Sequence, residues 1–283
     1  ASNSNAFGSL IQWYEDKPPV ALPCIKTVEE LENYSPPPVE ETLWNRMIEY
    51  YYAMKEYLEE GNLKVTMRGE FVKIDLQLHT GGESPFMIAT DLCSSKVYEW
   101  MYESPESLHR LLQIITERLI ETEKKMRTLC GFPKTGRWFL ADDTAQVISS
   151  KQFREFVVPY SGKVYDELTA GPNERIMHMC GRHTQLYPAL VEDLKIHGMW
   201  GYGSLNKPKE VRDGLGGKMW LLGNLNPILL CEGPKEQIII ETKRLLDALL
   251  PCGGIIIGDG YNIIPETPLE NLQLVVDTVT GYN

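Results

Sequence analysis

Hydrophobic and polar positions follow two different periods along the first third of the chain. Apolar residues at helical spacing predict a helix over residues 39–60, which ends at Gly61. A shorter helix is expected over residues 28–34, with Thr27 as its N-cap. Residues 71–78 (FVKIDLQL) alternate between apolar and polar with a period of two, which predicts a strand.

From residue 138 onward, a short apolar run that ends in small or polar residues is followed by an amphipathic helix, and this order recurs. The expected strands lie within RWFLADD, RIMHMCG, GMWGYGS, KMWLLGNLNP and GGIIIGDG, and the expected helices span residues 151–168, 185–197, 209–215, 235–249 and 269–278. Alternating strands and helices predict an α/β fold with parallel strands and right-handed crossovers.

Polar residues gather just after these strands, which is where the active sites of α/β barrels are built. With the strand at 71–78, six strand-and-helix units are expected, two fewer than a closed eight-fold barrel requires. We therefore expect a (β/α)8-type barrel that lacks its first one or two units, or an incomplete barrel. The expected organisation is a proline-rich extended segment at 1–40, followed by the barrel domain at 41–283.

Composition narrows the class of partner. The 283 residues carry a formal net charge of -11, which repels phosphate backbones and anionic membranes. Nucleic acid and membrane are therefore not expected as partners. Six cysteines without close pairing favour a reducing compartment, and we expect a cytoplasmic protein. The chain opens at Ala1, so a natural N-terminus with a targeting signal could be missing.

The stretch ERIMHMCGRH carries the strongest candidate for metal chemistry. Side chains alternate along a strand, so His178 and Cys180 are expected on one face of its end. Imidazole and thiolate are both zinc ligands, and a catalytic zinc uses three protein ligands. The spacing alone also fits a small buried cysteine beside a structural histidine, which leaves both interpretations open.

Carboxylates follow two other expected strands. Asp142 and Asp143 are neighbours and face opposite ways, so only one is expected to enter the barrel mouth, as a base or as a ligand for a cation or hydroxyl. Capping of the next turn is the alternative. Asp259 and Tyr261 lie in the glycine-flanked loop GDGY, where a plain turn aspartate and a packing tyrosine are equally compatible with the sequence.

The remaining candidates are binding residues. His79 is another strand-end imidazole, Asn224 lies in the loop GNLNP, and Tyr202 adds an aromatic ring near the rim. No phosphate-binding glycine loop and no GxSxG elbow is present, which argues against nucleotide binding at such a loop and against the common hydrolases.

Taken together, SPESLHRLLQIITE, SSKQFREFVVPY, LLGNLNP and PETPLENL make the chain, from about Phe7 to its end, resemble the uroporphyrinogen decarboxylase superfamily. The resemblance implies an α/β barrel, and it implies that the first strands lie outside this sequence. Decarboxylases of the family carry a tyrosine, a serine and a histidine where this chain has Asp91, Asp143 and Asp259. A porphyrinogen carries eight carboxylates, so these three charges disfavour porphyrinogen decarboxylation, at roughly 4 kcal/mol for each close contact.

The second branch of the superfamily contains cobalamin-dependent methyltransferases with a His-x-Cys pair, which His178 and Cys180 match. A cysteine usually follows the last strand in that branch, and here Tyr261 stands at that place. The resemblance therefore implies zinc held by His178 and Cys180 with an oxygen of Tyr261 or Asp259. It also implies catalytic roles for Asp142, Asp143 and Asp259, and substrate contacts from His79, Asp91, Asn224 and Tyr202.

The resemblance thus implies a corrinoid-dependent methyltransferase. Zinc would activate a thiol acceptor or a methyl ether, and the methyl group would move to or from cobalt in a separate corrinoid-binding protein. An O-demethylase component acting on a small aromatic methyl ether is one form of this expectation. The alternatives are a decarboxylase and a non-catalytic binding protein, and a homodimer is among the arrangements left open.

Overall fold

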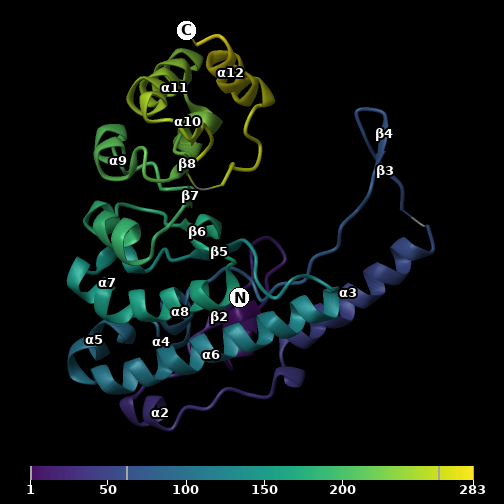
Figure 1. The fold of residues 1–283 in the computed structure, drawn as a ribbon, viewed down its shortest axis with the longest axis vertical. Helices are drawn as coiled ribbons and strands as arrows, with labels where there is room; N and C mark the ends of the chain where they lie inside the picture. The colour runs from purple at the N-terminus through teal and green to yellow at the C-terminus, as the bar shows by residue number, and fades with distance from the viewer. Residues whose placement is uncertain (1, 62, 261, 283) are drawn as a thin grey trace. The chain divides into compact units, whose positions relative to one another are not determined.

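The computed structural model of the protein describes residues 2–61, 63–260 and 262–282. The chain forms two compact units, residues 1–135 and 136–283 (Figure 1). Both contain helices and strands, and among the described residues the parallel sheet lies in the second unit.

The first unit is built around one long helix. Its elements in chain order are α1 (Ser2–Ala6), β1 (Leu10–Gln12), β2 (Val20–Leu22), α2 (Val28–Glu32), the 3₁₀ turn η1 (Val39–Glu41), α3 (Leu43–Glu59), β3 (Val65–Met67), β4 (Glu70–Val72), α4 (Pro85–Cys93), α5 (Lys96–Glu103) and α6 (Pro105–Cys130). Helix α6 buries a stripe of leucine and isoleucine side chains and contacts α2, α4 and α5. Each such fully buried side chain contributes about 1.5–3 kcal/mol to stability.

Local capping explains where the helices of this unit begin and end. Thr27 and Glu30 form a reciprocal capping box at the start of α2, which confirms the predicted helix and its N-cap. Helix α3 confirms most of the helix predicted over residues 39–60. Helix α6 ends at Gly131, whose φ of 72° is readily adopted only by glycine.

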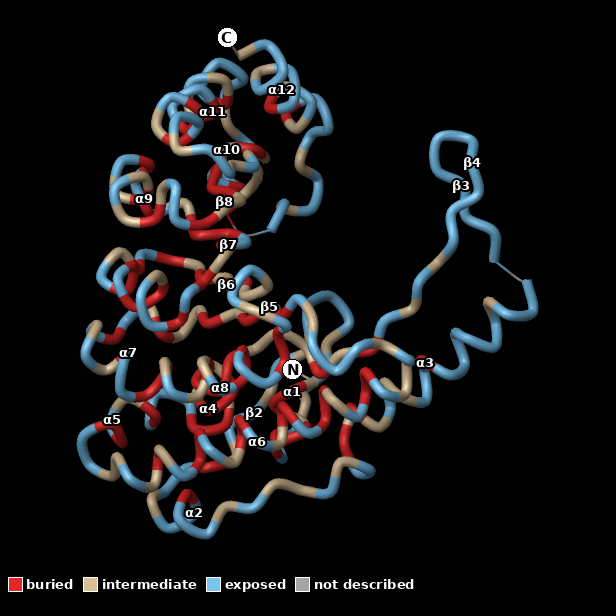
Figure 2. The backbone as a smooth tube through the Cα atoms, in the orientation of Figure 1, coloured by how far each residue is buried: buried red, intermediate tan, exposed pale blue. Residues whose placement is uncertain are grey.

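The strand predicted at residues 71–78 is wrong in its length and in its partner. Only Phe71 and Val72 belong to a strand, β4, and β4 pairs antiparallel with β3. Arg68 and Gly69 both have positive φ, which is the geometry of a tight hairpin turn between paired strands. The local turn therefore selects a hairpin where the period-two pattern suggested a parallel strand. Figure 2 shows that both strands of this hairpin are exposed along their length.

The second unit contains a five-stranded parallel sheet in the order β5-β6-β7-β8-β9. Its elements are β5 (Trp138–Ala141), η2 (Ala145–Val147), α7 (Ser150–Phe156), α8 (Val158–Leu168), η3 (Pro172–Glu174), β6 (Arg175–His178), η4 (Thr184–Leu186), η5 (Ala189–Asp193), β7 (Gly198–Trp200), α9 (Pro208–Leu215), β8 (Trp220–Leu222), α10 (Pro227–Glu232), α11 (Lys235–Leu249), η6 (Leu250–Cys252), β9 (Ile255–Ile256) and α12 (Leu269–Thr280). This confirms the α/β class and the parallel order; the described residues supply five strands of the expected barrel-type sheet.

Strand register gives the two faces of the sheet different roles. Leu140, Met177, Met199 and Leu221 lie in one row across β5 to β8, and all four are buried. Strand-end residues one position later, such as His178, face the other way. Because the strands are parallel, their carboxyl ends share one edge of the sheet, where the functional candidates gather.

Proline accounts for the helices that differ from their predictions. The helix predicted at 151–168 divides into α7 and α8, with Pro159 in the first turn of α8. The helix predicted at 185–197 is replaced by the 3₁₀ turn η4 and the π-helical segment η5, which begins after Pro188. Among the described residues, no helix has both the length and the hydropathy that crossing a membrane would require.

Candidate metal centre

The carboxyl end of β6 brings an imidazole and a thiol together. His178 is the last residue of β6, and Cys180 follows two positions later. The Nε2 atom of His178 lies 3.0 Å from the Sγ atom of Cys180. The two side chains therefore converge as their alternate positions on the strand predict.

A carboxylate from the neighbouring strand completes a three-residue cluster. Asp143 follows β5, and its Oδ1 atom lies 3.5 Å from Nε2 of His178. The same oxygen accepts the backbone N–H of Cys180 at 2.6 Å, which fixes the carboxylate against the strand end. One donor atom from each of Asp143, His178 and Cys180 lies within 4.8 Å of the other two. Nitrogen, sulfur and oxygen donors in this number suit zinc with an open coordination position.

The surrounding backbone orients the imidazole. The Nδ1–H group of His178 donates to the carbonyl of Trp200 at 2.6 Å. This hydrogen bond leaves the lone pair of Nε2 directed at the cluster, the arrangement that metal-ligating histidines use. Gly201 makes the close approach possible, because a Cβ atom there would lie 2.7 Å from Nδ1 of His178. Its φ of 76° also favours glycine.

Charge and burial keep the thiol protonated while no cation is nearby. Burial, and then the neighbouring Asp143 carboxylate, raise the pKa of Cys180 to about 12. A divalent cation would reverse this preference, since thiolate and carboxylate are then both held by opposite charge. The cluster is thus suited to exchange a proton for a metal ion.

Asp142 faces away from the cluster and organises the loop. Its side chain is fully buried, and Oδ1 accepts the backbone N–H of Ala145 at 3.0 Å and the hydroxyl of Thr144 at 3.2 Å. These bonds cap the 3₁₀ turn η2. The two neighbouring aspartates therefore diverge as predicted, with Asp143 at the cluster.

Two predicted binding residues belong to the unit of residues 1–135 and have partners within it. The imidazole of His79 lies 3.1 Å from Glu123 and 3.1 Å from Gln77. Asp91 accepts a hydrogen bond from the hydroxyl of Ser4 at 2.6 Å. Their predicted substrate contacts stay predictions.

The loops after β7 and β8 hold the other predicted binding residues. Asn224 donates to the carbonyls of Gly203 at 2.7 Å and Asn206 at 3.1 Å. The ring of Tyr202 is fully buried, and burial raises the pKa of its hydroxyl. Asn224 also borders a pocket of about 350 Å³, together with Ser204 and other residues of this unit.

The described residues of the loop after β9 lie against the loops after β7 and β8. Asp259 forms an isolated parallel bridge with Leu225 after β8, which ties the GDGY loop to its neighbour. A Cβ atom at Gly201 would lie 3.6 Å from the carbonyl oxygen of Gly260, so this loop runs close to the glycine that faces His178. Tyr261, the predicted third metal ligand, lies outside the described residues.

Asn206 is a functional candidate that sequence reasoning missed. Its side-chain amide donates to the carbonyls of Gly181 at 2.7 Å and Gly203 at 3.2 Å, and its oxygen accepts the N–H of His183 at 3.2 Å. It thereby holds the loop after Cys180 against the loop after β7. In the sequence, Asn206 is an asparagine three residues after the second glycine of GYG. The sequence alone does not distinguish such an asparagine from an ordinary turn residue.

Comparison with known proteins agrees with this fold. The profile of the uroporphyrinogen decarboxylase (URO-D) family matches residues 2–282. The chain is 28% identical over 205 residues to a uroporphyrinogen decarboxylase of Geobacter metallireducens, with 70% of this chain and 58% of the relative covered. It is 29% identical over 222 residues to the methylcobamide:CoM methyltransferase MtaA of Methanosarcina barkeri, with 75% and 60% covered.

A solved structure of a methyltransferase from Methanosarcina mazei aligns with a TM-score of 0.72 at 22% identity. The alignment covers 99% of this chain and 77% of that one, and it shows a shared fold. The chain spans 58% and 60% of the lengths of the two curated relatives described above.

Proposed function

The chain belongs to the uroporphyrinogen decarboxylase (URO-D) family, and from that premise we propose that it is a metal-dependent methyltransferase. It moves a methyl group between a small molecule and a corrinoid carried by a separate partner protein. The family contains both decarboxylases and methyltransferases, so the choice between them rests on the residues of the site.

The convergence of Asp143, His178 and Cys180 carries the proposal. Three donors from two adjacent strand ends match the ligand number of a catalytic zinc, and the imidazole is already oriented by its bond to the carbonyl of Trp200. Asp143 supplies the oxygen ligand that the resemblance had assigned to Tyr261 or Asp259. An oxygen in place of a second sulfur gives a harder site, and we propose zinc as its resident metal.

When bound, zinc supplies Lewis acidity that lowers the pKa of a substrate thiol or polarises the oxygen of a methyl ether. The chain's own residues hold the reaction centre and bind the substrate. His178 and Cys180 fix the position of the reaction centre, and Asp143 balances its charge. Asp259, in the adjacent loop, accepts a proton or a hydrogen bond from the substrate. Asn224 and Tyr202 shape the wall of the site after β7 and β8.

Several finer assignments belong to the same proposal. The methyl donor or acceptor is a small molecule, and an O-demethylase component is the form we favour. His79 and Asp91 stay candidate binding residues, while Asp142 acts as a positioning residue through its cap on η2. Six free cysteines agree with a cytoplasmic setting.

Decarboxylation of a porphyrinogen is the second candidate, because curated relatives of this chain include uroporphyrinogen decarboxylases. Its substrate carries many carboxylates. Asp143 places a negative charge within 3.5 Å of the only imidazole in the cluster, which would repel such a substrate. The methyltransferase assignment therefore fits the site better.

The test combines metal analysis with turnover. Purified protein is loaded with zinc and mixed with methylcobalamin and a panel of thiols, while the cobalt absorbance reports loss of the methyl group; aryl methyl ethers with reduced cobalamin test the reverse direction. One zinc per chain and transfer that fails in His178→Ala support the proposal. A zinc content near zero in both the wild type and His178→Ala would overturn the proposal. Conversion of uroporphyrinogen III to coproporphyrinogen III without metal would also overturn it.

A further inference from the structure

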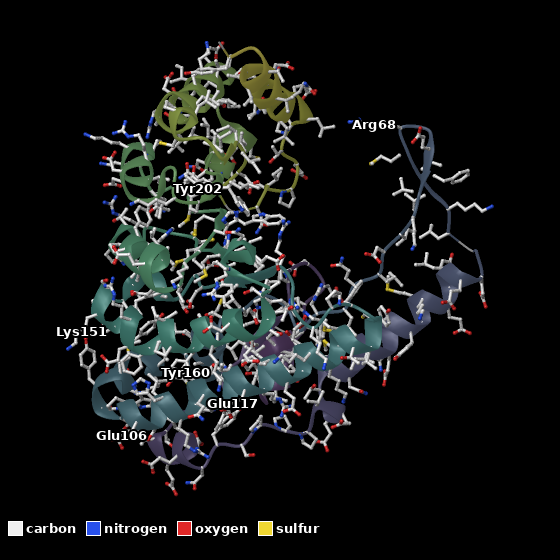
Figure 3. The ribbon with its side chains drawn as sticks, in the orientation of Figure 1. Arg68, Glu106, Glu117, Lys151, Tyr160 and Tyr202 are labelled. Atoms are coloured by element: carbon white, nitrogen blue, oxygen red, sulfur yellow. The ribbon has the colours of Figure 1, made fainter. Side chains whose placement is uncertain are left out.

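An arm of the first unit exposes an unusual amount of apolar surface. The arm consists of residues 46–61 and 63–76, that is, most of α3 and the hairpin of β3 and β4. Figure 1 shows the hairpin and the end of α3 reaching away from the other helices of their unit, and Figure 3 places Arg68 at the hairpin tip. Tyr50, Met54 and Tyr57 are all exposed and follow one another at helical spacing along α3. Contiguous exposed apolar surface of this kind marks an interaction site.

The arm contains a groove. Its volume is about 460 Å³, and its lining is almost wholly apolar: Tyr50, Ala53, Met54, Tyr57, Leu58, Leu63, Ile74 and Leu76. The helix forms one wall, and the segments that enter and leave the hairpin form the other. The groove is therefore shaped to receive an apolar segment rather than a polar or charged ligand.

The same arm carries a segment that fits such a groove. In the hairpin, Val65, Met67 and Phe71 are all exposed. Register places Val65 and Met67 on one face and Phe71 on the other, so both faces are partly apolar. A two-stranded hairpin is marginally stable in water by itself. Insertion of its apolar side chains into a groove would supply the packing that it needs.

Charge is complementary between the two parts of the arm. The end of α3 exposes Glu56, Glu59 and Glu60, with Lys55 as the nearby cation. The hairpin and its flanks expose three cations, Lys64, Arg68 and Lys73, against two acidic residues, Glu70 and Asp75. A hairpin laid along the helix of another arm thus brings opposite net charges together, which favours that encounter.

We propose that this arm is an interface between two copies of the chain, in which each copy inserts its hairpin into the groove of the other. One arm supplies both the inserting hairpin and the receiving groove, which is the self-complementarity that a two-fold interface requires. Every contact is then made twice. The proposal rests on the arm alone and is independent of the metal centre.

Sedimentation velocity of the full chain across a concentration series tests the inference. We expect a concentration-dependent dimer, and Phe71→Asp should raise its dissociation constant at least about tenfold because the lost burial occurs twice. Leu269→Asp is the matched control, since Leu269 and Phe71 are both 77% exposed. The control should leave the dimer unchanged. Circular dichroism melts establish that both variants fold.

Charge reversal gives a second, independent test. The pair Lys64→Glu and Lys73→Glu should weaken the dimer, and adding Glu56→Lys and Glu60→Lys should restore it. Two outcomes would overturn the proposal: a chain that stays monomeric up to the highest concentration, or a dimer that persists unchanged in folded Phe71→Asp. Larger, open-ended assemblies would also contradict it, because a closed two-fold contact ends at two copies.

Discussion

Replacing Gly201 with alanine tests how the imidazole of the candidate metal centre is held. The added Cβ atom would lie 2.7 Å from Nδ1 of His178, so the ring must move. Movement breaks the 2.6 Å hydrogen bond to the carbonyl of Trp200, which costs about 0.5–1.5 kcal/mol. The positive φ of 76° adds a backbone cost of about 1–2 kcal/mol. Metal affinity should fall by about 10- to 100-fold, as for other losses of a ligand's supporting bond.

Gly131→Ala is the matched control. Gly131 has a φ of 72°, and a Cβ atom there meets nothing within 4 Å. Both variants therefore carry the backbone cost, and only Gly201→Ala displaces His178. Cobalt(II) titrations give the affinity, and urea unfolding gives the stability. Equal cobalt affinity in the wild type and both variants would refute the idea that this glycine positions the ligand.

Three further outcomes follow from charges on buried groups. In metal-free protein, Asp143→Asn should lower the pKa of Cys180 and speed its alkylation at fixed pH, because burial and the carboxylate together raise that pKa; an unchanged rate by peptide mass spectrometry contradicts this. Arg127→Met leaves the fully buried Glu123 without its 2.8 Å ion pair, so unfolding in urea should become easier by about 3–5 kcal/mol. Burial alone would raise the pKa of Glu123, yet bonds from His79, a backbone amide and Arg127 lower it below its ordinary value. The resulting stability is present at neutral pH and is lost as pH falls through the folded pKa, so a flat urea midpoint from about pH 7 to about pH 3 would count against it.

Periodicity predicted the second unit well because its strands are short and apolar, and most of them are followed by an α-helix. The five strands from residue 138 onward appear in the expected order. The same method failed at residues 71–78, where the alternation is real but the turn at Arg68 and Gly69 pairs the chain locally. A two-residue turn with positive φ decides the partner of a strand, and hydrophobic alternation carries no such information.

One part of the candidate site could also be predicted from the sequence, and another part could not. His178 and Cys180 converge because they lie two residues apart at the carboxyl end of β6, so their geometry follows from their spacing in the sequence. Asp143 joins them from another strand, 35 residues before His178 in the chain, and only the register of β5 and β6 brings it there. Its place beside His178, and the support from Asn206, depend on contacts between distant segments.

We propose that Asp143, His178 and Cys180 together hold one divalent ion. The most direct measurement is the absorption spectrum of the protein titrated with cobalt(II) after removal of other metals. We predict saturation at one cobalt per chain, with a sulfur-to-cobalt charge-transfer band that disappears in Cys180→Ser and a lower affinity in Asp143→Asn. A spectrum without that band, or one that neither substitution alters, would show that these three residues do not bind the metal together.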